Sequence, residues 1–398
     1  MRIDTLTHHG LGRAEDGSLV PRTLPGEEAE LRDDGTVRII APSPDRVTPP
    51  CRHFKTCGGC TVQHASDTFV AAWKTGIVSR ALAAQDLPDT VAGIETSPAN
   101  SRRRARFSGR RTKSGATIGF HARASSDVID TPDCQLVTPG LLARRATAAA
   151  FTAAICSRKS ELGLTFTEGP AGDDLHLAHD AQLTEAMRHD LTRIAQEQGL
   201  ARLSYGDEVI VTLDPPVQVF GTGRVVPPPG AFLQATAHGQ ATLTAAVLRI
   251  TQGARRVVDL FAGCGTFSLP LATRARVHAV EGDAAMTRAL DAGWRATPGL
   301  HTLTTEARDL FRRPLLPDEL SAFDAAVVDP PRAGARAQIA ELAAAHVPTV
   351  AMVSCDPATF ARDARVLVGA GYAMAPPLVV DQFRWSPHVE LVTAFTMT

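Results

Sequence analysis

The stretch Asp259-Leu260-Phe261-Ala262-Gly263-Cys264-Gly265-Thr266-Phe267 decides the fold of this chain. It follows an aliphatic run, which we expect to be a buried strand, and it leads into an expected helix. The glycines at 263 and 265 let the backbone approach a ligand where a Cβ atom would collide. An acid precedes them, so the order D-x-F-x-G-x-G-x-F differs from the G-x-G-x-x-G of dinucleotide-binding turns. The stretch therefore predicts a ligand-binding turn that favours positive charge over a pyrophosphate.

Short aliphatic runs and helical patterns alternate from this turn to the end of the chain. The expected strands are Arg256–Phe261, Val277–Glu281, Ala325–Asp329 and Val347–Cys355, and the expected helices are Ala284–Ala296, Ala335–Ala345 and Pro357–Ala370. Such alternation predicts a Rossmann-like α/β domain, whose parallel sheet binds ligands at the carboxyl ends of its strands. We expect this domain to span residues 225–398, after a proline-marked boundary.

Acidic residues mark the carboxyl ends of the predicted strands. Glu281 ends the second strand, where a carboxylate can accept hydrogen bonds from ribose hydroxyls, and Asp309 follows further along the chain. With Asp259 they place three acids at successive strand ends. This pattern suits the sulfonium and ammonium groups of S-adenosylmethionine better than a nicotinamide dinucleotide. Loop and capping roles for Asp259 and Asp309 are the alternative.

Two further motifs end strands at the same expected edge, Asp329-Pro330-Pro331-Arg332 and Ser354-Cys355-Asp356-Pro357. Cys355 directly precedes a helix, so we expect the helix dipole to favour its thiolate; a buried structural cysteine is the alternative. A thiolate that adds to carbon 6 of uracil makes carbon 5 nucleophilic toward a sulfonium methyl group, and a base must then remove the carbon 5 proton. The candidate base is Glu390 in His388-Val389-Glu390.

Seven cysteines, an odd number without an export signal, argue against a disulfide framework. Four of them form the pattern C-x5-C-G-G-C with a distant fourth member, at Cys51, Cys57, Cys60 and Cys134. Four thiolates suit either zinc or a 4Fe–4S cluster, and their spacing does not decide between the two. Cys156, within the expected helix Gly140–Ser157, is the alternative fourth ligand.

The net charge of -1 gives no sign of a nucleic-acid partner, but the distribution of charge does. Ser101–Phe107 holds four arginines, and Arg110, Arg111, Lys113 and Arg123 follow. Such a patch can hold phosphates, and a solvated face is the alternative. Because the chain shows neither a signal peptide nor an apolar run that could span a bilayer, we expect a cytoplasmic protein with no membrane partner.

The residues before 225 divide into two expected segments. Residues 1–48 predict a few small β-strands, because brief apolar stretches alternate with turns at His9-Gly10, Asp16-Gly17, Pro25-Gly26 and Asp34-Gly35. Residues 49–224 predict a mixed α+β domain with strands such as Leu164–Thr167 and Val209–Leu213.

Together these motifs resemble those of the bacterial RNA uracil-C5 methyltransferases, in particular the iron–sulfur branch that makes 5-methyluridine in 23S rRNA. The resemblance covers essentially the whole chain. It rests on D-L-F-x-G-x-G at 259–265, D-P-P-R-x-G at 329–334, S-C-x-P-x-x-x-x-R-D at 354–363 and F-x-x-S-x-H-V-E at 383–390. The chain departs from the family at Asp356, where asparagine is more usual, and in lacking a proline directly after Phe383.

The resemblance implies a class I methyltransferase domain in which Cys355 is the nucleophile and Glu390 is the general base. It implies contacts to S-adenosylmethionine from Gln234, Phe261, Thr266, Glu281, Asp309 and Asp329. It also implies a structural 4Fe–4S cluster on the four clustered cysteines and an N-terminal TRAM-like, OB-type segment that grips RNA.

We therefore expect a monomeric enzyme that methylates a uridine, with 23S rRNA as the RNA substrate. A transfer RNA T-loop uridine is the alternative within this class, and the cysteine set favours ribosomal RNA. Amine methylation, another chemistry, usually shows N-P-P-Y where this chain has D-P-P-R; cytosine-C5 methylation is a further alternative. From a different class, a non-catalytic iron–sulfur RNA-binding protein is disfavoured because both Cys355 and Glu390 are present.

Overall fold

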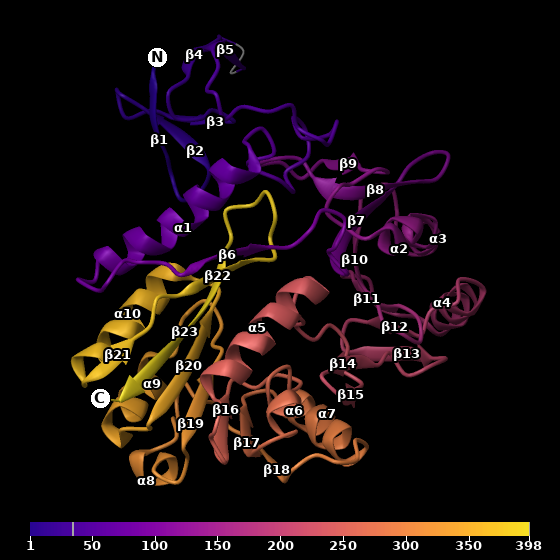
Figure 1. The fold of residues 1–398 in the computed structure, drawn as a ribbon. Coiled ribbons are helices and arrows are strands. Elements are labelled where there is room, and N and C mark those ends of the chain that lie inside the picture. Colours follow the sequence, from indigo (N-terminus) through magenta and orange to yellow (C-terminus); the bar gives the residue numbers. More distant parts are fainter. Residues whose placement is uncertain (34–35, 398) are drawn as a thin grey trace.

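A nine-stranded sheet organises the carboxyl-terminal half of this computed structural model, which describes residues 1–33 and 36–397. Its first five strands in spatial order are parallel, and the last strands of the chain extend it with antiparallel pairing (Figure 1). The strands are β18 (Leu303–Ala307), β17 (Arg276–Glu281), β16 (Arg256–Leu260), β19 (Ala325–Val328), β20 (Thr349–Ser354), β23 (Glu390–Met397), β22 (Leu378–Asp381) and β6 (Gly93–Thr96), with β21 (Tyr372–Met374) paired to β23. The predicted Rossmann-like α/β fold is confirmed.

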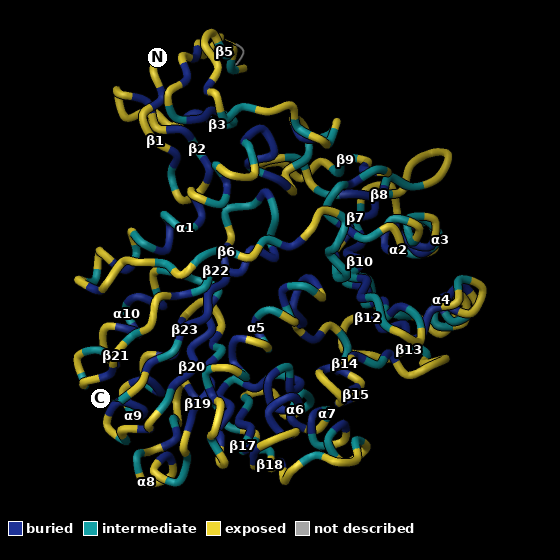
Figure 2. Tube along the Cα trace, in the orientation of Figure 1, coloured by how far each residue is buried: buried dark blue, intermediate teal, exposed yellow. Residues whose placement is uncertain are grey.

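Helices cover both faces of this sheet, because successive side chains of each strand point to opposite sides. Val257 packs in the core on one face, and its neighbour Val258 packs in the core on the other. The first core includes α5 (Ala237–Ile250), α6 (Ser268–Leu271) and α7 (Ala284–Arg295), and the second includes α1 (Asp67–Ala83), α8 (Pro317–Leu320), α9 (Arg336–Ala345) and α10 (Pro357–Gly369). Figure 2 shows the strands buried between these layers.

The middle of the chain forms a seven-stranded sheet beside this domain, with α3 and α4 packed on it (Figure 1). Its strands are β13 (Glu208–Thr212), β12 (Arg202–Tyr205), β11 (Asp174–Ala178), β10 (Glu161–Thr167), β7 (Arg104–Arg111), β8 (Ala116–His121) and β9 (Val128–Asp130), and its helices are α2 (Pro139–Ala143), α3 (Arg145–Ile155) and α4 (Glu185–Glu197). A hairpin of β14 (Gln218–Phe220) and β15 (Gly223–Val225) follows. The single helix expected over 140–157 is thus two helices, α2 and α3, that meet at Arg144.

Two small sheets contain the first strands of the chain. They consist of β1 (Ile3–Leu6), β2 (Leu11–Ala14) and β3 (Leu19–Pro21), and of β4 (Glu28–Leu31) and β5 (Val37–Ala41). The turn expected at Asp34-Gly35 lies outside the described residues. Within the described parts of the chain, no helix is long and apolar enough to cross a membrane.

Two elements from before residue 225 belong to the nine-stranded domain. β6 pairs in parallel with β22, and α1 packs against the core on the same face as α10. The segment between β22 and β23, yellow in Figure 1, reaches from the sheet toward the first hundred residues. The amino-terminal part of the chain therefore helps to build the carboxyl-terminal sheet and the segment that precedes β23.

The fully buried Lys74 of α1 joins these parts. Its ammonium group donates to Oδ1 of Asp381 at 2.6 Å and to the carbonyl oxygens of Phe383 and His388 at 3.2 and 3.0 Å. All three N–H donors of the ammonium group are therefore used. Because Asp381 ends β22 and His388 lies just before β23, this one side chain fixes both ends of the connecting segment.

We predict that Lys74→Met lowers the free energy of unfolding by about 3–5 kcal/mol, because it leaves the Asp381 carboxylate buried without its cation. Chemical denaturation of the full chain measures the change. The exposed Lys159→Met is the matched control and should change stability by less than about 0.5 kcal/mol. Equal stabilities for the two variants would contradict the role given to Lys74.

Candidate active site

The turn after β16 places backbone against a cavity at the carboxyl edge of the parallel strands. Gly263 and Gly265 have φ of 55° and 94°, and a Cβ atom on Gly265 would lie 2.3 Å from Cδ1 of Leu290. Phe261, which is not a glycine, also has a positive φ of 62°. Such strained conformations are concentrated at functional sites. Three residues with positive φ in one turn are more than an ordinary connection between a strand and a helix requires, which indicates a functional role for this turn.

The cavity has a volume of about 480 Å³. All eight residues predicted for catalysis and for the methyl donor line it: Gln234, Phe261, Thr266, Glu281, Asp309, Asp329, Cys355 and Glu390. They come from segments up to 156 residues apart in the sequence, between Gln234 and Glu390. The structure also places Phe232, Cys264, Met286, Phe311 and Arg332 in the lining, which the sequence patterns did not assign.

Two acids on one side of the cavity are held by backbone N–H groups. Glu281 accepts hydrogen bonds from the N–H groups of Gly263 and Asp283, each at 2.9 Å, and Asp309 accepts one from Phe311 at 2.9 Å. The ring of Phe311 lies 5.5 Å from that of Phe261. Two acceptors and two aromatic faces on one wall suit a ligand with hydroxyl groups and a flat ring.

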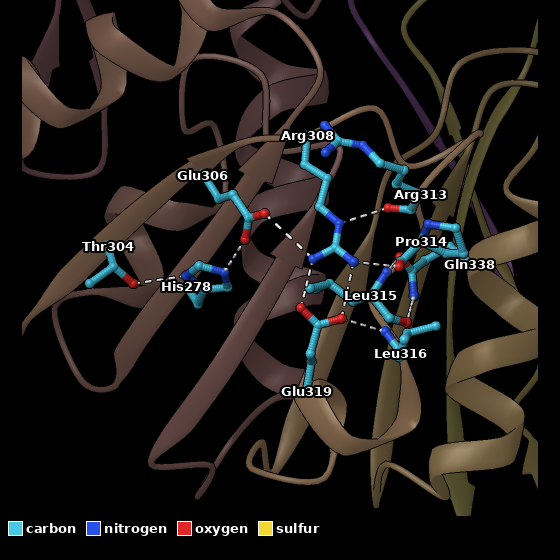
Figure 3. A network of polar contacts seen from close by, with 10 residues as sticks. All are labelled: His278, Thr304, Glu306, Arg308, Arg313, Pro314, Leu315, Leu316, Glu319 and Gln338. Atoms are coloured by element: carbon cyan, nitrogen blue, oxygen red, sulfur yellow. Dashed lines mark hydrogen bonds and ion pairs between the residues drawn. The ribbon is translucent and has the colours of Figure 1, made fainter.

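A network of polar contacts anchors the segment that presents Asp309 (Figure 3). Arg308 forms an ion pair with Glu319 at 2.6 Å and another with Glu306 at 3.4 Å. Its guanidinium also donates to the carbonyl oxygens of Arg313 and Pro314, each at 2.7 Å. Because one planar group binds the chain on both sides of the turn, the position of the neighbouring Asp309 is fixed from outside the cavity.

Asp259 does not reach the cavity, although it leads the glycine turn. It is fully buried, and its Oδ2 accepts a hydrogen bond from the hydroxyl of Ser268 at 2.5 Å. Burial, with repulsion from Asp329 and Glu281, raises its pKa to about 7. Asp259 lies within β16, so neither direct contact with a ligand in the cavity nor the loop or capping role considered as the alternative describes it.

Carboxyl groups dominate the electrostatics of the cavity. Burial raises the pKa of Asp329 to about 7, with repulsion from Glu281, and raises that of Glu390 to about 8, with repulsion from Asp329. Among the described residues that line the cavity, the basic side chain is that of the exposed Arg332. A bound cation would therefore favour the ionised forms of these acids.

The surroundings of Cys355 oppose the activation expected from the helix dipole. The side chain of Asp356 caps α10 by accepting hydrogen bonds from the N–H groups of Ala358 and Thr359 at 3.0 and 2.9 Å. Burial, with repulsion from Glu390 and Asp329, raises the pKa of Cys355 to about 11. Burial and the neighbouring carboxyl groups therefore favour the protonated thiol in the ligand-free protein.

Gln382 is a buried residue that sequence patterns did not identify. Its Oε1 accepts a hydrogen bond from the backbone N–H of Ala235 at 2.8 Å, and its Nε2 donates to both Gln234 and Glu390. The residue directly precedes Phe383 of the terminal motif, but the sequence gives no sign of a contact with a glutamine 148 residues earlier.

The four clustered cysteines line a second cavity of about 470 Å³, together with Arg102 and residues of the segment between β22 and β23. All four are free thiols. Burial, with repulsion among the cysteines, raises the pKa of Cys60 to about 12. Cys156 lies outside this cavity, in the core of the seven-stranded sheet.

The described residues form no ready-made metal site, because no set of three or more His, Cys, Asp or Glu is placed to hold a metal ion. The four thiols nevertheless line one cavity, and four thiolates are a ligand set for zinc or for an iron–sulfur cluster.

The arginine run lies partly inside the protein. Arg103 donates to Oε1 of Gln240 at 2.6 Å, Arg104 donates to the carbonyl oxygen of Gly230 at 3.1 Å, and Arg102 lies over the ring of Phe383 at 5.5 Å. Burial lowers the pKa of each of these three arginines. This run therefore connects the seven-stranded sheet to the cavity-bearing domain as well as carrying charge.

Known proteins resemble this chain over its whole length. An RNA methyltransferase of Rhizobium meliloti (strain 1021), named as uncharacterized, is 42% identical over 395 residues, which cover 96% of this chain and 95% of that protein. The 23S rRNA (uracil(1939)-C(5))-methyltransferase of Chromohalobacter salexigens is 32% identical over 430 residues, covering 100% of this chain and 89% of that protein. No family model matches the chain.

One solved structure shares the complete fold. The Pyrococcus abyssi tRNA (uracil-54, C5)-methyltransferase, in complex with S-adenosyl-L-homocysteine, superposes with a TM-score of 0.76 over 100% of both chains at 19% sequence identity. The relatives and the shared fold both agree with the motifs found in the sequence. The chain belongs to the RNA uracil-C5 methyltransferase family.

The raised pKa values predict how stability changes with pH. The carboxyl groups of Asp329 and Glu390 have pKa values of about 7 and 8 in the folded protein and of about 4 when unfolded, so the folded state binds more protons between these limits. Their contribution to stability is present below about pH 4 and is lost as the pH rises through 7 and 8. We expect the temperature at the midpoint of thermal unfolding to decrease as the pH rises from about 6 to about 9.

Asp329→Asn removes one of these titrating groups and should flatten that fall, as measured by thermal unfolding in a series of buffers. Asp318→Asn, in the first turn of α8 and outside the cavity, is the control. A pH dependence that is the same in wild type and Asp329→Asn would refute the assignment.

Proposed function

We propose that this RNA methyltransferase transfers a methyl group from S-adenosylmethionine to carbon 5 of a uridine in 23S rRNA. The observation that carries the proposal is the single cavity lined by the thiol of Cys355, the carboxyl group of Glu390 and an acid-rich wall. The relative that is 32% identical over the whole chain is named as a 23S rRNA uracil-C5 methyltransferase, which supports this choice of RNA.

Each step has a group of the chain to perform it. Cys355, as the thiolate, forms a bond from its sulfur to carbon 6 of the uracil, and the electron pair of the carbon 5–carbon 6 double bond makes carbon 5 the nucleophile. S-adenosylmethionine, when bound, supplies an electrophilic methyl group on its sulfonium; carbon 5 takes this methyl group as its bond to sulfur breaks, which leaves S-adenosylhomocysteine. Glu390 then accepts the proton from carbon 5, the electron pair of that C–H bond restores the double bond, and the bond from Cys355 to carbon 6 breaks.

The electrostatics of the cavity link donor binding to activation of the thiol. Repulsion from Glu390 and Asp329 contributes to the raised pKa of Cys355. A cationic ligand beside these carboxylates offsets that repulsion and lowers the pKa of the thiol. The same cation favours the ionised form of Glu390, which the final proton transfer needs. The nucleophile and the base therefore become competent together when the donor is present.

The four cysteines that line the second cavity are those that would hold a 4Fe–4S cluster: Cys51, Cys57, Cys60 and Cys134. The chemistry of four thiols around a wide space fits such a group. The N–H groups of Thr61 and Val62, just after Cys60, donate to the carbonyl oxygen of Trp385 at 2.7 and 3.1 Å. We assign the cluster a structural role, because its loop holds the segment that leads to Glu390.

A transfer RNA T-loop uridine is the second candidate substrate. The Pyrococcus abyssi enzyme that shares the fold is named as a tRNA methyltransferase, and at 19% identity that likeness shows the fold alone. Mapping 5-methyluridine in RNA from a strain that lacks the gene distinguishes the two, because the modification should disappear from 23S rRNA and persist in transfer RNA. Loss from transfer RNA instead would replace the proposed substrate.

We predict that Cys355→Ala lowers methyl transfer by at least about a thousandfold while S-adenosylmethionine still binds, because only the nucleophile is lost. Incorporation of a labelled methyl group and calorimetric binding measure the two effects. Cys156→Ala, a buried cysteine outside both cavities, should retain activity. Full activity of Cys355→Ala would exclude the mechanism.

Glu390→Gln should give a different defect. It blocks removal of the carbon 5 proton after methyl transfer, so a covalent protein–RNA adduct should accumulate and resist denaturation. Electrophoresis under denaturing conditions detects it. If Glu390→Gln accumulates no adduct while Cys355 remains intact, another group must act as the base.

Metal and sulfide analysis tests the cysteine site. Anaerobically purified protein should contain about four irons and about four acid-labile sulfides per chain, and Cys60→Ser should lose most of both. Cys264→Ser, a buried cysteine outside this site, is the control. One zinc per chain and no sulfide would overturn the assignment.

A further inference from the structure

The amide of Gln382 has one possible orientation. Its Oε1 meets the backbone N–H of Ala235 at 2.8 Å, and an N–H group can only donate. The NH2 group must therefore face the other way, where it donates to Oε1 of Gln234 and to Oε2 of Glu390. These three partners therefore determine which end of the amide is the oxygen and which is the nitrogen, a choice that the shape of the amide alone would leave open.

Close packing holds Gln382 in this place. Gly239 lies in the first turn of α5, and a Cβ atom there would be 2.8 Å from Cβ of Gln382 and 2.9 Å from its Oε1. The missing side chain at 239 lets α5 lie directly against the glutamine. Gln382 and its three partners, Gln234, Ala235 and Glu390, are all buried, so water does not compete for these hydrogen bonds.

The orientation has a consequence for the state of Glu390. An amide NH2 group only donates, and an ionised carboxylate only accepts, so the contact favours the ionised form. It therefore opposes the burial that raises the pKa of Glu390. It engages Oε2, and within the described part of the chain Oε1 is left to accept a proton.

We propose that Gln382 is a positioning residue that favours the ionised form of Glu390 and orients it to remove the carbon 5 proton. This inference rests on the proposed function. Gln382 also occupies Oε1 of Gln234, so the NH2 group of Gln234 is what remains for a ligand in the cavity. Gln234 then offers donors to acceptor atoms of the methyl donor, such as its carboxylate oxygens.

Gln382→Met tests the inference, because it keeps the length of the side chain and removes both donors. In the dependence of product release on pH, the acidic limb should move upward by about one to two pH units, the size expected when a carboxylate loses a hydrogen bond. Covalent protein–RNA adduct should accumulate at pH 7, and the rate should recover toward that of the wild type near pH 9. A loss of folding would not produce this recovery.

Gln382→Asn, whose amide is one methylene too short to bridge the three partners, should shift the profile in the same direction. It serves as the test if Gln382→Met does not fold. The matched control is Gln338→Met, since Gln338 is also fully buried and binds the N–H and carbonyl groups of Leu315 at 2.8 and 3.1 Å, outside the cavity (Figure 3). Its pH profile should match that of the wild type.

The outcomes separate the inference from the function on which it rests. If Glu390→Gln traps an adduct and the profiles of both Gln382 variants superimpose on that of the wild type, the role of Gln382 is refuted and the function stands. If Glu390→Gln traps nothing and the wild type methylates no uridine, the proposed function itself fails.

Discussion

Carboxyl groups crowded at the carboxyl edge of the nine-stranded sheet set the chemistry of this protein. Burying several acids together is costly, and the pKa values of Asp259, Asp329 and Glu390 are raised as a result. The same repulsion acts on the thiol of Cys355. In the proposed reaction, a cationic methyl donor in the cavity offsets the repulsion at Asp329, Glu390 and Cys355, so the cavity is best suited to reaction when the donor occupies it.

The amino-terminal part of the chain supports this cavity from outside. Lys74 fixes both ends of the segment before β23, and the loop after Cys60 holds its middle through the carbonyl oxygen of Trp385. Trp385 itself packs against Phe54 and Cys60. The loop that carries Cys60 is thus connected through Trp385 to the segment that precedes the proposed base.

The sequence predicted the parts of the site that depend on local pattern. Glycines and acids at strand ends must meet at one edge of a parallel sheet, so Glu281, Asp329 and Cys355 could be placed together in advance. The protonation state of Cys355 could not, because it depends on burial and on repulsion from Glu390 and Asp329, which only the folded chain brings to the thiol.

Long-range pairing limited the sequence analysis elsewhere. β6 pairs into a sheet whose other strands begin after residue 250, and α1 packs on the same sheet. No periodicity in the sequence reveals either contact. The same holds for Lys74, whose partner Asp381 is 307 residues away, and for Gln382.

The most direct test of the account uses RNA that carries 5-fluorouridine, because fluorine at carbon 5 blocks the final proton removal in the wild-type enzyme. Mass spectrometry of the digested complex should find the methylated nucleotide attached to the peptide that contains Cys355; attachment to another residue, or no covalent complex, would contradict it.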